Sequence, residues 1–230
     1  MRESGNCEEH RERFGGTVKL QLSLDLVDLN QALNIIQQTK DSIDIVEVGT
    51  PLALLEGVKA LKTIKSQFPD SELLADYKII DGGYYEASMA FDNGADIVTV
   101  LAAASDATIN GSIRAAKDFG KEILVDLIRC VGLEEQLKRL DSLGADYVCV
   151  HTPIDDQDGK NSPVAELKIA RDVIQKSKLA IAGGLQIANL EQILPYSPDI
   201  VIVGSGIVKS ENMKETAAKV KNILEKNNGQ

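Results

Sequence analysis

The chain has 230 residues, with 25 Lys or Arg against 35 Asp or Glu, so its formal net charge is −10. This acidic balance argues against a nucleic-acid partner, because phosphate backbones are bound by clustered Lys and Arg. No stretch reaches the about 18–20 apolar residues that a membrane span requires. The scattered Cys7, Cys130 and Cys149 exclude a disulfide framework or a zinc site. Without a secretory segment, the sequence predicts a cytoplasmic protein.

Residues 1–16 differ in composition from the rest of the chain. They hold three Arg and four Glu, have almost no apolar residues, and end in Gly15-Gly16. Such a segment cannot bury an apolar face, so we predict a disordered N-terminal extension or an expression remnant. Residues 17–230 are expected to form a single domain.

From Thr17 onward, strand-sized apolar runs alternate with amphipathic stretches of helical period. The predicted elements in chain order are strand 18–25, helix 28–39, strand 43–49, helix 52–67, strand 72–78, helix 84–93, strand 97–101, helix 106–119, strand 122–128, helix 133–143, strand 147–151, helix 163–177, strand 179–182, helix 189–194, strand 200–203 and helix 212–226. Strand followed by helix, eight times, predicts parallel strands joined by crossover helices.

A short repeat supports this architecture. Gly94-Ala95-Asp96 precedes one predicted strand and Gly144-Ala145-Asp146 another, with Ser197-Pro198-Asp199 at the matching place before the last strand. Each Gly is expected to end a helix with positive φ. Eight units in about 214 residues predict an α/β fold, a (β/α)8 TIM barrel. The alternative, a Rossmann-type open sheet, lacks Gly-x-Gly-x-x-Gly after the first strand.

In such a barrel, catalytic side chains lie at the carboxyl ends of the strands. The polar residues predicted to lie there are Asp25, Glu47, Asp76, Lys78, Asp126 and His151. Alternation in the first strand places Leu20, Leu22 and Leu24 against the helices and Asp25 inside the barrel. Any one of these groups alone is compatible with a structural ion pair or hydrogen bond. Several buried like charges together require a compensating cation or substrate, which predicts a functional cluster.

Glu47 and Asp76, from neighbouring strands, can share a hard cation through carboxylate oxygens. No Cys or second His is available, so Mg²⁺ is favoured over zinc. Lys78 lies between Asp76 and Asp81 in sequence, and these carboxylates favour its charged form. A charged amine acts as a proton donor or electrostatic stabiliser, whereas a Schiff-base lysine needs a depressed pKa.

Glycines follow the last two predicted strands: Gly183-Gly184 after the seventh, and Gly204-Ser205-Gly206 after the eighth. In barrels, the loops at those two places commonly bind phosphate through backbone N–H groups. A turn that needs glycine is the alternative explanation for each pair. Both together predict a small phosphate ester as substrate.

Ala75-Asp76-Tyr77-Lys78-Ile79-Ile80-Asp81 resembles the Asp-x-Lys-x-x-Asp signature of the orotidine-monophosphate decarboxylase suprafamily. The segments Glu47-Val48-Gly49-Thr50-Pro51, Thr99-Val100-Leu101, Ala182-Gly183-Gly184 and Val203-Gly204-Ser205 are similar to the branch that contains 3-hexulose-6-phosphate synthase and 3-keto-L-gulonate-6-phosphate decarboxylase. The resemblance runs from about Lys19 to the last helix. It implies a Mg²⁺-dependent homodimeric barrel that acts on a sugar phosphate.

By this resemblance, Glu47 and Asp76 hold the metal, and Asp25 and Lys78 lie beside it. Asp81 is expected to reach into the neighbouring subunit's site. His151 or Asp25 is expected to move protons at the carbons that react through an enediolate.

Three positions distinguish the two activities of the branch. Asp126, Ile154 and Ala182 stand where the decarboxylase has Glu, Arg and Thr, whereas His151-Thr152-x-x-Asp155-x-Gln157 is similar to the synthase pattern. We therefore expect aldol condensation of formaldehyde with D-ribulose 5-phosphate, and its reverse. Decarboxylation of 3-keto-L-gulonate 6-phosphate and a non-catalytic sugar-phosphate-binding barrel are the alternatives. The departures from the family pattern are Ala102, Pro153 and Asp158-Gly159-Lys160.

Overall fold

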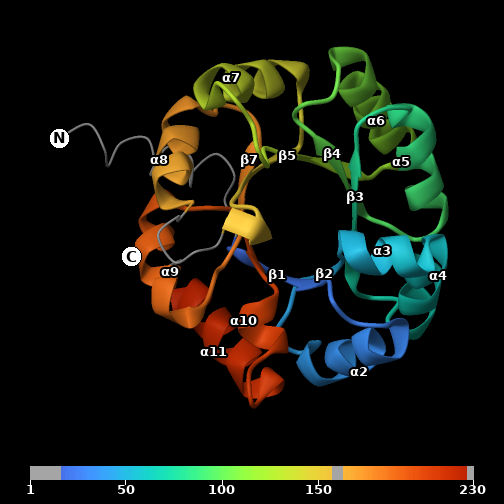
Figure 1. Ribbon diagram of the computed structural model, residues 1–230, viewed down its shortest axis with the longest axis vertical. Helices are drawn as coiled ribbons and strands as arrows, with labels where there is room; N and C mark the ends of the chain where they lie inside the picture. Colours follow the sequence, from blue (N-terminus) through green and yellow to red (C-terminus); the bar gives the residue numbers. More distant parts are fainter. Residues whose placement is uncertain (1–16, 157–162, 227–230) are drawn as a thin grey trace.

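The structure, a computed structural model, describes residues 17–156 and 163–226. Its strands are all parallel and close into one barrel in the order β1 to β8, with the α-helices outside (Figure 1). The predicted (β/α)8 barrel is confirmed. The N-terminal extension predicted over 1–16 lies outside the described residues, as does Cys7. None of the described helices is long and apolar enough to cross a membrane.

The elements keep the predicted order and differ mainly at their ends. The strands are β1 (Lys19–Leu24), β2 (Ile45–Val48), β3 (Glu72–Ile79), β4 (Ile97–Leu101), β5 (Glu122–Asp126), β6 (Tyr147–His151), β7 (Lys178–Ala182) and β8 (Ile200–Val203). The helices are α2 (Leu29–Thr39), α3 (Thr50–Glu56), α4 (Val58–Gln67), α5 (Gly83–Asp92), α6 (Asp106–Phe119), α7 (Leu133–Leu143), η1 (Ile154–Asp156), α8 (Val164–Val173), α9 (Ile187–Ile193), η2 (Leu194–Tyr196), α10 (Ser205–Val208) and α11 (Met213–Lys226).

Two predicted helices were wrong in extent. The helix predicted over 52–67 is two helices, α3 and α4, because Gly57 adopts a φ of 59° between them. The helix predicted over 163–177 ends at Val173. Its continuation is prevented by Asp141 of α7, whose carboxylate accepts hydrogen bonds from the backbone N–H groups of residues 175, 176 and 177. The short α10 directly after β8 was not predicted.

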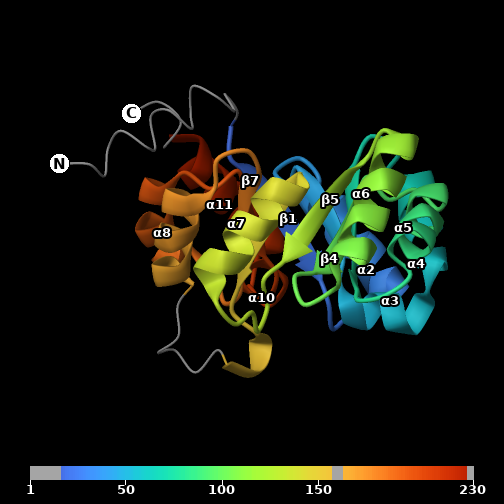
Figure 2. The same cartoon turned by 90° about the horizontal axis from the view of Figure 1, so that it is seen from above.

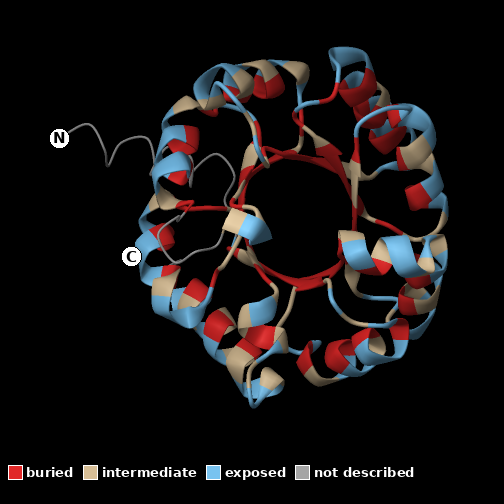
Figure 3. Cartoon of the chain, in the orientation of Figure 1, coloured by how far each residue is buried: buried red, intermediate tan, exposed pale blue. Residues whose placement is uncertain are grey.

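The apolar core has two parts, one on each side of the barrel wall. Leu20, Leu22 and Leu24 of β1 are fully buried between the wall and the helices, as the alternation predicted. Inside the barrel, Ile45, Leu74 and other apolar side chains of the strands fill the middle. Figure 3 shows the resulting ring of buried strands inside helices that expose only their outer faces. The charged side chains of the barrel interior lie toward its two ends.

A repeated hydrogen bond closes the amino-terminal end of the barrel wall. The aspartate before each even-numbered strand accepts from a backbone N–H near the start of the preceding strand. These clamps are Asp44 with Leu20 (2.6 Å), Asp96 with Leu73 (2.9 Å), Asp146 with Ile123 (2.9 Å) and Asp199 with Leu179 (2.7 Å). The three-residue repeat in the sequence therefore marks three of these four clamps, those of Asp96, Asp146 and Asp199. Its Gly94 and Gly144 have the expected positive φ, 104° and 85°.

Inside the same end lies a layer of charged side chains that we call the basal ring: Lys19, Glu72, Glu122 and Lys178. The Lys19 ammonium lies 2.7 Å from the Glu72 carboxylate, and the Lys178 ammonium lies 3.1 Å from that of Glu122. The Tyr147 hydroxyl lies within hydrogen-bonding distance of both Glu122 and Lys178. The ring carries two cations and two anions, so its formal charges cancel.

Candidate active site

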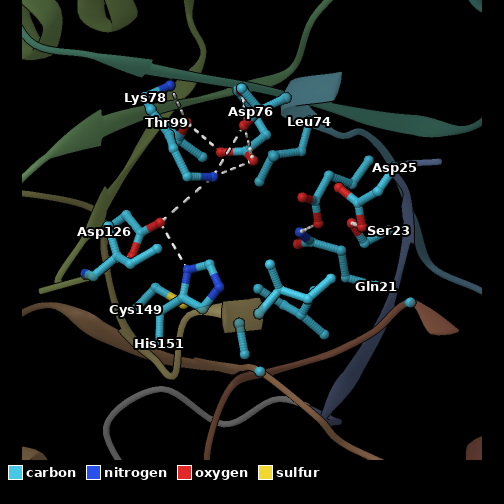
Figure 4. A pocket seen from close by; sticks show the side chains of 18 of the residues that line it. Gln21, Ser23, Asp25, Leu74, Asp76, Lys78, Thr99, Asp126, Cys149 and His151 are labelled. Carbon is cyan, nitrogen blue, oxygen red and sulfur yellow. Dashed lines mark hydrogen bonds and ion pairs between the residues drawn. The ribbon is translucent and has the colours of Figure 1, made fainter. Parts of the chain in front are cut away.

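A cavity of about 370 Å³ lies at the carboxyl-terminal ends of the strands. In the side view of Figure 2, η1, which follows β6, protrudes from this end. The predicted site residues that line the cavity are Asp25, Glu47, Asp76, Lys78, Asp126, His151, Gly183, Gly184, Gly204 and Ser205. Figure 4 shows Lys78 between Asp76 and Asp126, with Gln21, Ser23 and Asp25 on the opposite side.

Asp76 and Lys78 form the most tightly bonded pair of the cavity. The Lys78 ammonium donates to Asp76 Oδ2, which also accepts from the Thr50 hydroxyl at 2.7 Å. The other oxygen, Oδ1, accepts from the Thr99 hydroxyl at 2.8 Å. Burial opposes ionisation of Asp76, but the charge of Lys78 and these hydrogen bonds outweigh it and lower the pKa of Asp76. Asp76 is therefore a carboxylate.

The second carboxylate beside Lys78 is Asp126, and not Asp81 as the sequence spacing suggested. Asp126 Oδ2 lies 3.9 Å from the Lys78 ammonium. Burial favours the neutral amine, but Asp76 and Asp126 prevail and raise the pKa of Lys78, so it is charged as predicted. Asp81 is exposed outside the cavity, where it accepts a hydrogen bond from the Gly82 N–H.

Asp126 also orients His151. Asp126 Oδ2 lies 2.9 Å from His151 Nδ1, and Oδ1 accepts from the Ile128 N–H at 2.9 Å. A carboxylate on Nδ1 favours the tautomer that carries its proton there, which leaves Nε2 as the basic nitrogen. Asp126 is 3% exposed, so its carboxylate is shielded from water.

Glu47 and Asp25 occupy the side of the cavity that has less positive charge. Burial raises the pKa of Glu47 to about 8, and the charges of Asp76 and Asp25 add to this effect. One Glu47 oxygen accepts from the Gln21 amide at 2.5 Å. Burial also raises the pKa of Asp25, although the Ser23 hydroxyl donates to it at 2.9 Å.

The oxygens of Glu47, Asp76 and Gln21 form a donor set that fits a hard cation. Glu47 and Asp76 offer carboxylate oxygens, and Gln21 Oε1 is buried without a hydrogen-bond partner in the described structure. Within the described residues, no three His, Cys, Asp or Glu side chains are grouped to hold a metal ion by themselves. Mg²⁺ suits such a site, because it commonly keeps several waters and takes one or two carboxylates plus substrate oxygens.

Close approaches require glycine at two positions at this end of the barrel. A Cβ at Gly49 would lie 2.2 Å from Asp25 Oδ1, so a side chain there would displace the carboxylate. Gly183 has a φ of 104°, and a Cβ there would lie 2.3 Å from the Thr152 carbonyl oxygen. Gly183 therefore fits the turn that was the alternative explanation for it. Phosphate binding by Gly183, Gly184, Gly204 and Ser205 stays a prediction.

Several polar residues of the cavity wall were not among the predicted site residues. Gln21 and Ser23 share the inward face of β1 with Asp25, so the period-two alternation that located Asp25 also indicates them. Thr50 and Thr99 hold Asp76, and no spacing signal in the sequence links them to it. Cys149 lies on the cavity floor, where burial raises the pKa of its thiol.

Residues 18–220, nearly the whole described barrel, match the model of the Orotidine 5'-phosphate decarboxylase / HUMPS family. The chain belongs to this family. The chain is 45% identical to a 3-hexulose-6-phosphate synthase of Bacillus subtilis (strain 168) over 208 residues. These residues cover 90% of the chain and 99% of the synthase.

The fold of the chain is similar to two solved structures, to one more than to the other. The crystal structure of 3-hexulose-6-phosphate synthase from Salmonella typhimurium has a TM-score of 0.89 at 40% identity, covering 91% of this chain and 100% of the other. That of 3-keto-L-gulonate-6-phosphate decarboxylase from Vibrio cholerae O1 has a TM-score of 0.74 at 27% identity, covering 92% and 99%. Sequence and structure are thus both more similar to the synthase.

Proposed function

We propose that this family member is a Mg²⁺-dependent 3-hexulose-6-phosphate synthase that works in the cytoplasm. It would condense formaldehyde with D-ribulose 5-phosphate and catalyse the reverse aldol cleavage. The observation that carries the proposal is the arrangement of Lys78 between Asp76 and Asp126, with His151 bonded to Asp126, in one cavity. The similarity to the synthases of Bacillus subtilis and Salmonella typhimurium supports it.

The proposed reaction needs a base, a proton donor and positive charge. The base removes a proton from carbon 1 of ribulose 5-phosphate, beside the carbonyl group, to give an enediolate. This carbon attacks formaldehyde, and the former aldehyde oxygen takes up a proton. Glu47 and Asp76 would hold the Mg²⁺ ion, which would supply positive charge near the oxygens on which the negative charge develops. The Lys78 ammonium adds positive charge beside Asp76.

His151 and Asp25 are the residues that we propose for the proton transfers. His151 Nε2 is the basic nitrogen because Nδ1 faces Asp126. Asp25 has a raised pKa, which brings it closer to the pH range in which a carboxyl group exchanges protons efficiently. The two side chains line the same cavity from β6 and from the end of β1. Backbone N–H groups at Gly183, Gly184, Gly204 and Ser205 would bind the phosphate.

The decarboxylase alternative has less support from the cavity. Ile154, where the decarboxylase has Arg, lines the mouth and is 68% exposed. Ala182, where it has Thr, is buried in the wall. Neither side chain donates a hydrogen bond, so neither can help to position water near a carbon that must be protonated after carbon dioxide leaves.

A side-by-side assay tests the proposal. We expect the purified protein to consume formaldehyde and ribulose 5-phosphate in equal amounts with Mg²⁺, and to stop when EDTA removes the metal. Carbon-13 formaldehyde allows the new carbon–carbon bond to be followed by NMR. Decarboxylation of 3-keto-L-gulonate 6-phosphate should be slower under the same conditions. A faster decarboxylation would reverse the assignment, and no consumption of either substrate would end it.

We also propose that the active unit is a homodimer whose subunits share their sites. Asp81 is exposed outside its own cavity, beside Ile80, which is 53% exposed. Further large apolar side chains are exposed on α3 and α5: Leu54, Leu55, Tyr85 and Met89. Exposed apolar surface of this kind is typical of protein interfaces.

Mixing two inactive variants tests the shared site. Asp76→Ala and Asp81→Ala should each be inactive alone. After subunit exchange, activity should partly return, because one site of each mixed dimer contains neither substitution. No recovery after verified exchange would contradict the shared site while leaving the reaction assignment open to the assay above.

A further inference from the structure

Thr99 makes two hydrogen bonds that link the backbone of Lys78 to the carboxylate of Asp76. Its hydroxyl donates to Asp76 Oδ1 at 2.8 Å, and the same oxygen accepts from the Lys78 backbone N–H at 2.8 Å. Thr99 is 3% exposed, so water does not compete for these bonds. We propose that Thr99 is a positioning residue that sets the Lys78 ammonium against Asp76. The expected effect of Thr99 on kcat rests on the proposed function, whereas its expected effect on the Lys78 backbone does not.

The backbone at Lys78 is unusual and requires such support. Lys78 has a φ of 48°, in the left-handed region that side chains other than glycine rarely adopt. The pairing of β3 with β4 changes register here: Ala75 pairs with Val98, and Ile79 pairs with Val100. Between these two pairs the chain moves four residues along β3 but only two along β4. Thr99 lies between the two pairs on β4, and its hydroxyl accepts a hydrogen bond from the Lys78 N–H.

This irregularity lets the lysine reach its partner. Asp76 and Lys78 are two residues apart, and the Lys78 ammonium donates back to Asp76 Oδ2 as well as lying near Asp126. A hydroxyl is suited to the linking position because it donates and accepts at once. Valine has nearly the shape of threonine and does neither, whereas serine keeps the hydroxyl.

Removal of the Thr99 hydroxyl leaves other bonds in place. Thr50 still donates to Asp76 Oδ2 at 2.7 Å and lies 3.1 Å from the Lys78 ammonium. The Asp76 carboxylate therefore stays in the cavity when Thr99 is changed to Val. Thr99→Val removes both Thr99 hydrogen bonds, the one to Asp76 Oδ1 and the one that holds the Lys78 backbone, and only the Asp76 bond has a substitute in Thr50.

The experiment compares Thr99→Val with Thr99→Ser and with a matched control, Thr39→Val. Thr39 is 1% exposed, and its hydroxyl donates to the Ile35 carbonyl at 2.8 Å within α2, away from the cavity. We measure kcat, KM for ribulose 5-phosphate, and hydrogen exchange of the Lys78 amide by NMR. Thr99→Val should lower kcat by about ten- to hundred-fold and change KM far less. It should also speed exchange at Lys78.

The two other variants separate positioning from general loss of a buried hydroxyl. Thr99→Ser should restore kcat and Lys78 protection nearly to those of the unmodified protein, and Thr39→Val should change neither. The proposal is overturned if Thr99→Val keeps kcat within about twofold, or if Thr99→Ser is as impaired as Thr99→Val. If the unmodified protein is inactive on both substrates, the proposed function fails. Lys78 exchange then decides alone: protection retained in Thr99→Val overturns the positioning role, and selective loss supports it.

Discussion

In the basal ring at the amino-terminal end of the barrel, each glutamate faces a lysine: Glu72 with Lys19, and Glu122 with Lys178. At the carboxyl-terminal end, four carboxylates share one lysine and one histidine: Asp25, Glu47, Asp76 and Asp126 with Lys78 and His151. At the first end, each negative charge is neutralised by a lysine of the same chain. The second end keeps negative charge that a bound cation would neutralise, which is the mark of a binding site.

The pKa values of two acids show the same difference. At the amino-terminal end, burial opposes ionisation of Asp96, but hydrogen bonds from Lys121, Leu73 and Lys65 outweigh it and lower its pKa. At the other end, burial raises the pKa of Glu47 to about 8. Asp96 therefore contributes stability that is lost as pH falls through its lowered pKa. Glu47 has the opposite effect, because the folded state binds its proton more tightly than the unfolded state does.

The largest expected effect is at the site. Asp76→Ala should lower aldol activity by about 10²–10³-fold or more, because Lys78 loses its closest partner and the proposed metal loses a ligand. The fold should persist, since the change also relieves repulsion from Glu47 and Asp25. Steady-state kinetics across a Mg²⁺ titration and circular dichroism measure the two quantities. Unchanged activity with unchanged Mg²⁺ dependence would contradict the proposal that the carboxyl-terminal end is the active site and that Asp76 binds the metal.

At the opposite end, stability should change and kcat should not. Asp96→Ala leaves the buried Leu73 N–H without its acceptor and removes the partner of Lys65 and Lys121. We expect the free energy of unfolding to fall by about 2–3 kcal/mol, measured by urea denaturation. The control Glu134→Ala breaks only an exposed pair with Lys138 and should leave the free energy of unfolding nearly unchanged, because water screens such a pair. A large loss of kcat in Asp96→Ala would show that the two ends are not separable.

The smallest effect is in the pH dependence of stability. In EDTA, the free energy of unfolding should carry a contribution from Glu47 that falls as pH rises from about 4.5 to about 8. Glu47→Gln should remove that contribution, since an amide does not ionise but can still accept from the Gln21 amide. At pH 8 the variant should be the more stable protein by at least about 1 kcal/mol. Equal pH profiles for the two proteins would show that burial does not perturb Glu47.

The order of the strands and the side of the barrel on which polar residues lie could be predicted from sequence. Alternation in β1 was enough to place Asp25 inside and Leu22 outside, because a strand has a period of two. The Gly-Ala-Asp repeat was enough to predict the helix ends at Gly94 and Gly144. These are local signals, and each depends only on residues close in the chain.

What could not be predicted depends on contacts between distant segments. The end of α8 at Val173 depends on Asp141 of another helix, and the link from Lys78 to Asp126 depends on a register change between strands. Asp44, the fourth clamp, lacks the Gly-Ala that marks Asp96 and Asp146. The spacing of Lys78 and Asp81 indicated a pair that the chain does not form within one subunit.

The clamps at the amino-terminal end divide the barrel into four modules of two strands each. Each joins two consecutive strands, β1 with β2, β3 with β4, β5 with β6, and β7 with β8. The lysines that neutralise two of the clamp aspartates come from other modules: Lys221 reaches Asp44, and Lys121 reaches Asp96. Duplication and fusion of a gene encoding one such module would therefore carry the clamp along with its pair of strands. The strand pairing between modules, such as that of β2 with β3, and the charges between modules would remain to be matched by later substitution.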